Sequence, residues 1–314
     1  MFRIPNPPDT KASVEELTDY IECEVVRVRE LYIRDVFRQF AIQDDEEKIE
    51  GIEDSNDEWF DQKVNEVINQ VLLRHKFTGD KYPFELEGQI LKIKANVPEV
   101  FSMLYIFLLL TTRLNMGNER IHDGLDGTQL FEHLSAKVAE NYFGIRAESV
   151  VFGTATEGSF SEKIIDLISK IGEGVSFVNR GNGPITANDD KLDIVVWKNF
   201  KDESYSKLIG FGQCKTGTSW LIRGPSTLNP QTFCQKWFSQ QPTPIPMKLF
   251  FCSVYFGVND YNKTSEAQGI MFDRFRIMDY LPTPLDKTLY KDIRAWNLAA
   301  TKYFCHLIRN NQSR

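Results

Sequence analysis

The 314 residues are 42% hydrophobic, which is enough to bury the core of one large domain or two ordinary ones. The longest apolar stretch, Val100 to Leu110, falls short of the roughly 18 residues that cross a bilayer, so a membrane protein is not expected. The net charge of −7 is uneven: residues 1–100 carry 23 acidic and 13 basic side chains, and residues 101–314 carry 21 and 24. This asymmetry indicates two parts with separate roles.

The start of the chain, MFRIPNPPDT, has neither a basic leader nor a long apolar segment, so a cytoplasmic location is expected. Apolar residues near a 3.6-residue spacing then run from Ser13 to Phe37, and Glu16 completes a capping-box pattern. A long amphipathic helix is predicted there. The acidic run from Asp44 to Asp61 is typical of a solvated loop or helix edge, and a helical segment follows to Leu73.

Short apolar bursts between Tyr82 and Lys94 predict a small hairpin, and Pro98 opens an apolar helix that continues to Leu114. The segment from Gly117 to Thr128 contains three glycines and two aspartates, which is typical of a domain joint. We therefore expect residues 1–120 to form an acidic, mostly helical N-terminal domain with a regulatory or interaction role. Residues 121–314 are expected to form the second domain.

The second domain is predicted to be an α/β sandwich, with a mixed sheet flanked by helices. Its expected helices are 129–143, 160–171, 230–240 and a closing helix at 289–309, and its expected strands are 148–153, 192–197, 208–215, 247–256 and one or two within 269–281.

The cysteines and histidines argue against a zinc enzyme. The five cysteines are widely scattered without a CxxC pair, and the four histidines form no HxxxH or HxH pair. We expect the cysteines to be buried free thiols.

Polar residues that could bind a metal or take part in catalysis occur at the ends of two predicted strands. Asp193 begins KLDIVVWKNF, and the next strand, IGFGQCKTG, ends with Gln213 and Lys215 two positions apart. Because residues i and i+2 share a face, Asp193, Gln213 and Lys215 are expected to converge at one end of the sheet, with Cys214 on the opposite face. Oxygen ligands for a hard divalent cation beside a positive group suit phosphodiester hydrolysis.

This D…QxK arrangement resembles the PD-(D/E)xK nuclease superfamily in its Mrr-type form, which has Gln at the middle position. That form also carries a Glu on the preceding helix, in a phrase similar to Phe131-Glu132-His133-Leu134-Ser135-Ala136. The resemblance covers roughly residues 128–256. It implies a restriction-endonuclease-like fold, with Asp193, Gln213 and the Cys214 carbonyl holding Mg²⁺ or Mn²⁺, Glu132 supporting the metal or water, and Lys215 activating the nucleophile.

The sequence departs from the superfamily pattern in three places. A helix and a strand inserted at Phe160 to Phe177 lengthen the usual path from the helix of Glu132 to the strand of Asp193. Leu192 stands where the pattern has a proline, and Gln213 supplies one formal charge fewer than Glu or Asp, which predicts weaker metal affinity. Lys191 and Arg223 are further candidates for contacts with nucleic acid, and Trp220 and Trp237 are candidates for lining the cleft.

Each site residue also has a simpler interpretation: Asp193 as a strand-edge cap, Lys215 as an edge charge that blocks aggregation, and Glu132 as an exposed helical carboxylate. The resemblance implies a Mg²⁺-dependent endonuclease acting on DNA, in bacterial restriction or anti-phage defence. Its N-terminal domain would then dock a protein partner or form a homo-oligomer. Two alternatives remain open: a non-catalytic nucleic-acid-binding or scaffolding subunit, and a nuclease effector active only within a larger complex.

Overall fold

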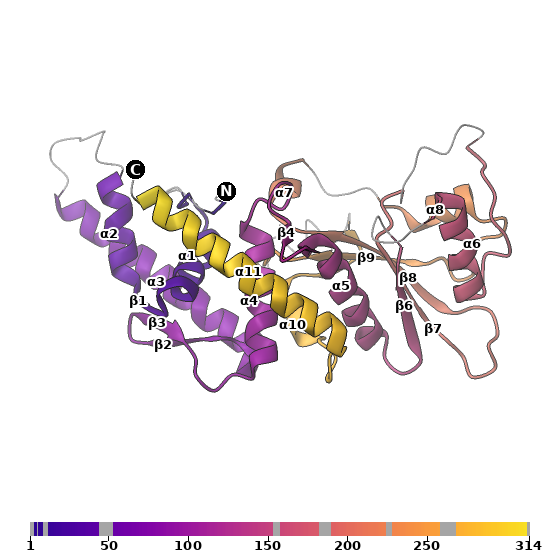
Figure 1. Ribbon diagram of the computed structural model, residues 1–314, viewed down its shortest axis with the longest axis horizontal. Coiled ribbons are helices and arrows are strands. Elements are labelled where there is room, and N and C mark those ends of the chain that lie inside the picture. Colours follow the sequence, from indigo (N-terminus) through magenta and orange to yellow (C-terminus); the bar gives the residue numbers. More distant parts are fainter. Residues whose placement is uncertain are drawn as a thin grey trace. The chain divides into compact units, whose positions relative to one another are not determined.

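The computed structural model describes residues 3–4, 6–8, 12–43, 53–152, 158–181, 190–223, 228–257 and 268–312 (Figure 1). The chain divides into two compact units. The first comprises Met1–Leu125 and Lys291–Arg314, and the second comprises Asp126–Tyr290. The first boundary falls within the predicted joint, but the end of the chain differs from the expected division at 121–314.

The C-terminal helix α11 (Lys287–Gln312) belongs largely to the first unit, because its apolar side packs there. Trp296 is fully buried, and its indole N–H donates to the Arg120 carbonyl at 2.8 Å. Asn297 donates to the Met103 carbonyl at 3.1 Å. The helix itself was predicted from periodicity, whereas its partner depends on tertiary packing that periodicity does not specify.

The first unit consists of helices and a small antiparallel sheet in the order β1-β3-β2. Besides α11, its elements are α1 (Val14–Val28), β1 (Glu30–Tyr32), α2 (Ile33–Gln43), α3 (Glu53–Thr78), the 3-10 helix η2 (Gly79–Lys81), β2 (Phe84–Glu87), β3 (Ile90–Ile93), α4 (Glu99–Arg113) and β4 (Ile121–His122), which pairs with β5 (Leu125–Asp126). The predicted hairpin and the helix after Pro98 are confirmed. Within the described ranges, no helix is long and apolar enough to cross a membrane.

The single long helix predicted between Ser13 and Phe37 is wrong. Its start is as expected, because the Ser13 hydroxyl accepts the Glu16 N–H at 3.3 Å. Arg29 then adopts a φ of 78° and ends α1, and a short strand pairs with β3 before α2 begins. The apolar periodicity continued across this break because Ile33 and Phe37 of α2 are also buried.

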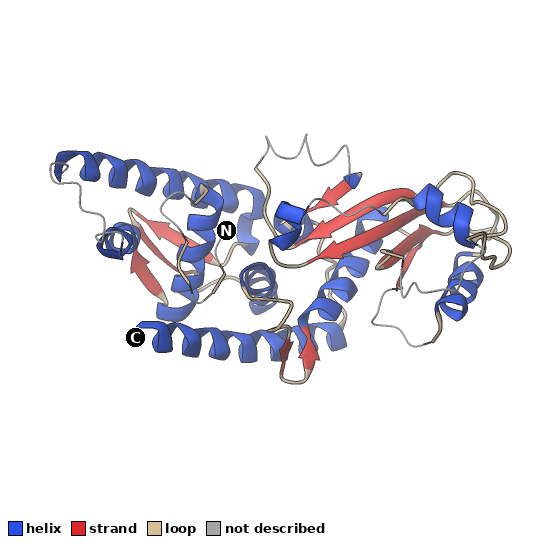
Figure 2. Cartoon of the chain, turned by 90° about the horizontal axis from the view of Figure 1, so that it is seen from above, coloured by secondary structure: helices blue, strands red, loops and turns tan. Residues whose placement is uncertain are grey.

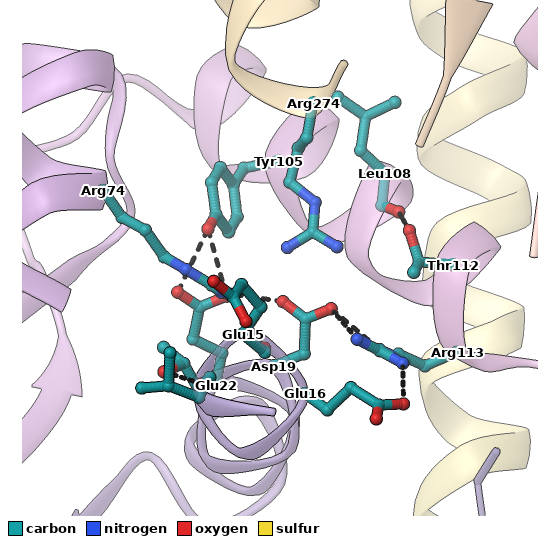
Figure 3. A network of polar contacts seen from close by, with 12 residues as sticks. Glu15, Glu16, Asp19, Glu22, Arg74, Tyr105, Leu108, Thr112, Arg113 and Arg274 are labelled. Atoms are coloured by element: carbon teal, nitrogen blue, oxygen red, sulfur yellow. Dashed lines mark hydrogen bonds and ion pairs between the residues drawn. The ribbon is translucent and has the colours of Figure 1, made fainter. Parts of the chain in front are cut away.

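A buried network of charges joins α1 to α3 and α4 (Figure 3). Asp19 accepts from Arg74 and from Arg113, each at 2.7 Å. Glu22 pairs with Arg74 at 2.8 Å and accepts from the Tyr105 hydroxyl at 3.0 Å. Burying charges is costly unless each one is paired and hydrogen bonded, as these are. Part of the acidic excess of the N-terminal region is therefore a core feature rather than solvated surface.

The second unit contains a five-stranded mixed sheet in the order β10-β9-β8-β7-β6 (Figure 2). Strands β6, β7 and β8 are antiparallel, and β9 and β10 run parallel to β8. The α/β class is confirmed at this level. The elements are α5 (Gly127–Phe143), β6 (Ala147–Val151), α6 (Phe160–Ile171), β7 (Ile194–Lys198), β8 (Leu208–Lys215), α7 (Ser219–Arg223), α8 (Pro230–Trp237), β9 (Met247–Cys252), β10 (Ile270–Phe272) and α10 (Arg274–Asp279).

The segment 269–281 differs from the prediction, because only its first part is a strand. The Asp273 side chain accepts the Arg276 N–H at 3.0 Å and caps α10 there. Alternating apolar and charged residues favoured a second strand, but this local cap starts a helix instead.

The two faces of the sheet are covered by different helices. Ile209 and Phe211 belong to a hydrophobic cluster with residues of α6 and α8. On the other face, α5 approaches β8 closely, and a Cβ added at Gly210 would lie 2.9 Å from the Phe143 ring. The glycines of β8 therefore allow α5 to pack against the strand.

Candidate active site

The last three residues of β8 are Gln213, Cys214 and Lys215. Strand alternation places Gln213 and Lys215 on the face that also carries Ile209 and Phe211. Cys214 faces α5, where its thiol and the Ser135 hydroxyl share a hydrogen bond. The end of β8 thus presents an amide and an ammonium on one side and a packed thiol on the other.

Asp193 lies immediately before β7, beside the end of β8. Its N–H donates to the Gly212 carbonyl at 3.0 Å, and its own carbonyl accepts the Phe152 N–H at 2.7 Å. Its carboxylate oxygen Oδ2 accepts the main-chain N–H of Cys214 at 2.7 Å. The carboxylate therefore lies against the peptide group that joins Gln213 to Cys214.

Gln213 is 2% exposed, and its Oε1 is buried with no hydrogen-bond partner within the described part of the chain. A buried amide oxygen without a donor is costly, which indicates a place for a cation or a donor. An Asp193 carboxylate, a Gln213 amide and the Cys214 carbonyl are the hard oxygen ligands that Mg²⁺ and Mn²⁺ prefer. The residues present therefore fit the expected metal.

The charged side chains of the predicted site affect the pKa of the Cys214 thiol. Burial raises its pKa, the negative charges of Asp193 and Glu132 raise it further, and the positive charge of Lys215 opposes them. Electrostatic interactions weaken with distance, so all three side chains are close enough to Cys214 to affect its pKa. The hydrogen bond from the Cys214 N–H places the Asp193 carboxylate beside the main chain of Gln213, and Lys215 follows Cys214 on the same strand.

Glu132 is placed differently from the other three candidates. It lies on α5, the helix on the Cys214 side of β8, and not on the face that carries Gln213 and Lys215. It is half-buried, and its Oε2 is shielded from solvent, which contradicts the interpretation of an exposed helical carboxylate.

The weaker candidates have mixed outcomes. Lys191 is exposed and has a φ of 70°, two residues before Asp193. Arg223 is the last residue of α7, and its side chain lies outside what the structure describes. Trp220 and Trp237 are both buried in hydrophobic clusters, so the expectation that they line a cleft is not met.

Sequence reasoning missed one contact beside the site. The Trp237 indole N–H donates to Asp190 Oδ2 at 2.7 Å, three residues before Asp193. No local pattern indicates this contact, because Trp237 lies on a helix forty-seven positions later in the chain.

Histidine, cysteine, aspartate and glutamate side chains form no group of three or more that could hold a metal ion among the residues described. The donor set at β8 is of another kind, since an amide and a main-chain carbonyl join the carboxylate. In comparisons of the chain with protein-family models, with curated proteins and with solved structures, nothing matched.

Proposed function

We propose that the chain is a Mg²⁺-dependent endonuclease of the PD-(D/E)xK kind, which hydrolyses DNA phosphodiester bonds in restriction or anti-phage defence. One observation carries the proposal. The Asp193 carboxylate is fixed on the Cys214 N–H beside Gln213, whose buried Oε1 has no hydrogen-bond partner in the described residues, and Lys215 follows on the same strand.

The roles of the side chains follow from their chemistry. Asp193, Gln213 and the Cys214 carbonyl hold the metal, which supplies Lewis-acid stabilisation of the charge that develops on the phosphoryl oxygens. The Lys215 ammonium orients the attacking water and stabilises the same charge. Glu132, from the α5 side, accepts a hydrogen bond from water near the site. The hydrogen bond from the Cys214 N–H holds the Asp193 carboxylate in one orientation, so the carboxylate does not have to move during the reaction.

The first test compares metal-dependent cleavage by the wild type, Asp193→Ala and Lys215→Ala. Supercoiled plasmid, linear duplex, single-stranded DNA and RNA are each incubated with Mg²⁺, with Mn²⁺ and with a chelator. Both substitutions are expected to lower the rate on the order of 10²- to 10³-fold, because Asp193→Ala removes a ligand of the metal and Lys215→Ala removes the positive charge aimed at the reacting phosphate.

Asp202→Ala and Lys201→Ala are matched controls, since both residues are exposed in the connection between β7 and β8. They are expected to cleave as the wild type does. Cleavage that survives Asp193→Ala and Lys215→Ala would refute the site. Metal-independent DNA binding without cleavage would favour the scaffolding alternative, and cleavage only with added cell extract would favour an effector that needs a complex.

Gln213 offers a sharper test of the metal site. Gln213→Leu removes the amide oxygen at nearly the same size and is expected to abolish metal-dependent cleavage. Gln213→Glu adds the missing formal charge and is expected to lower the Mg²⁺ concentration for half-maximal rate about tenfold, since ligand charge strengthens binding of hard cations. Equal metal dependence in Gln213→Glu, Gln213→Leu and the wild type would show that this side chain does not hold the ion.

A further inference from the structure

The turn that leads into Asp193 has an unusual backbone. Asp190 and Lys191 are consecutive residues other than glycine, with φ values of 48° and 70°. Side chains disfavour this left-handed region, although aspartate and asparagine tolerate it better than most. Such a conformation persists only where neighbouring groups hold it, and it is concentrated at functional sites.

The groups that hold this turn lie at the end of α8. The Trp237 indole N–H donates to Asp190 Oδ2 at 2.7 Å, and the Lys236 ammonium lies 3.3 Å from the same oxygen. Trp237 is itself fixed, since it is 2% exposed and its ring packs against Phe160 and stacks on Phe177. The donor of this hydrogen bond is therefore part of a rigid aromatic cluster.

The turn is anchored on its other side as well. Leu192 is fully buried in the same cluster as Trp237. Asp193 comes next, one residue before β7 begins at Ile194. It therefore lies at the end of the strand pairing, where backbone hydrogen bonds open most easily. The position of its carboxylate thus depends on how the preceding turn is held.

We infer that Trp237 is a positioning residue, which through Asp190 holds the left-handed turn and so places the Asp193 carboxylate against the Cys214 N–H. The inference rests on the proposed function for its catalytic consequence. Its structural consequence, the hydrogen bond from Cys214 to Asp193, exists whatever reaction the site performs. The two can therefore be measured separately.

The test is Trp237→Phe, which removes the indole N–H but keeps an aromatic ring. The matched control is Trp197→Phe. Trp197 lies in the same cluster and is also 2% exposed, but its Nε1 has no hydrogen-bond partner in the described residues. We expect Trp237→Phe to lower kcat about 10- to 100-fold with KM within about twofold, as for a small displacement of a reacting group. Trp197→Phe should stay within about twofold of the wild type.

Asp190 provides a second pair of variants that leaves the aromatic cluster intact. Asp190→Asn keeps an oxygen that accepts the indole N–H and tolerates the left-handed turn, so it should retain most of the wild-type kcat. Asp190→Ala keeps neither property and should match Trp237→Phe. Equal losses in Asp190→Asn and Asp190→Ala would overturn the role of this hydrogen bond.

A readout independent of cleavage is hydrogen exchange of the Cys214 amide, which donates to the Asp193 carboxylate. Trp237→Phe should raise its exchange rate at least tenfold, whereas Trp197→Phe should not, even where both variants melt at the same temperature. Equal exchange in the two variants overturns the inference and leaves the proposed function standing if the wild type cleaves DNA. Faster exchange in Trp237→Phe alone supports the inference, even if a wild type without metal-dependent cleavage refutes the proposed function.

Discussion

Cys214 contributes its main chain to the candidate site, whereas its thiol takes no part in the proposed chemistry. Its N–H holds Asp193, and its side chain is packed against α5 beside Ser135. An ionised thiolate there would add a third negative charge next to Asp193 and Glu132. Burial and these two carboxylates raise the pKa of the Cys214 thiol well above its ordinary value, so the group stays neutral.

This protection predicts low thiol reactivity in the folded protein. Burial also raises the pKa of Cys252 well above the ordinary range and that of Cys234 to about 12. Because the thiolate is the reactive form, iodoacetamide at pH 8.5 should leave Cys234 and Cys252, which are both buried, unmodified in the native protein and modify them in urea. Mass spectrometry of the alkylated peptides measures this. Equal labelling in both states would contradict the buried environments.

The same thiols give stability a pH dependence of defined sign. Their pKa values are higher in the folded chain than in the unfolded chain, where thiols titrate near about 8.5. As the pH rises past that value, the unfolded state ionises first, and the free energy of unfolding should fall. Urea unfolding at pH 7.5 and pH 10 should show a smaller decrease in Cys234→Ala than in the wild type.

Elements were predictable where local chemistry determines their ends. Phe160–Ile171 has its bounds as predicted, because Ser159 and Glu162 form a capping box and Gly172 adopts a φ of 72° after the last turn. Leu208–Lys215 also has its predicted bounds. The break at Arg29 and the helix at Arg274 were missed, because one depends on pairing with β3 and the other on a cap within an alternating pattern.

The candidate site could be predicted in part for the same reason. Strand periodicity is enough to place Gln213 and Lys215 on one face with Cys214 on the other. It does not reveal that the Asp193 carboxylate bonds to a main-chain N–H, nor that Trp237 reaches Asp190. These contacts join segments distant in the sequence, and no local pattern encodes them.

Gly212 of β8 is packed so closely that a larger side chain is expected to destabilise the protein. A Cβ added at Gly212 would lie 2.6 Å from Ile194, which is fully buried and branched at Cβ. Gly212→Ala should therefore lower the free energy of unfolding by about 1–3 kcal/mol, the usual cost of overpacking a core. It should also slow cleavage, because the Gly212 carbonyl accepts the Asp193 N–H.

Gly117→Ala is the control for Gly212→Ala, since the nearest atom to its Cβ would be at 3.5 Å, an ordinary contact. Thermal and urea unfolding of both variants measure the difference. A Gly212→Ala protein as stable as the Gly117→Ala protein would mean that Ile194 moves aside without cost, and that β7 and β9 leave more room than their packing implies.

At the scale of the whole molecule, the division into units changes how the charge is distributed. The first unit has 26 acidic and 20 basic side chains, and the second has 18 and 17, because basic residues near the C-terminus belong to the first. The unit that holds the candidate site is therefore nearly neutral and not basic. The proposed nuclease activity would therefore require a few local cations to contact phosphate, since no overall positive charge attracts DNA.

The same division predicts that α11 stabilises the first unit and not the second. Trp296 is fully buried there. The centroid of its ring lies 5.1 Å from that of Phe107 and 5.2 Å from that of His122. Trp296→Ala should cost about 3–5 kcal/mol, as for other large aromatic residues truncated in a core. Hydrogen exchange of the full chain should show lost protection in α1 and α4, with β7 and β8 unchanged.

Leu298→Ala is the control for Trp296→Ala, because Leu298 lies on the same helix and is 40% exposed. It should change the free energy of unfolding by less than about 0.5 kcal/mol. Equal loss of protection across both units in Trp296→Ala would mean that they unfold as one cooperative body. Loss confined to the first unit would mean that the sheet carrying Asp193 and Gln213 remains folded when the acidic helical unit opens, so the two can act as separate modules.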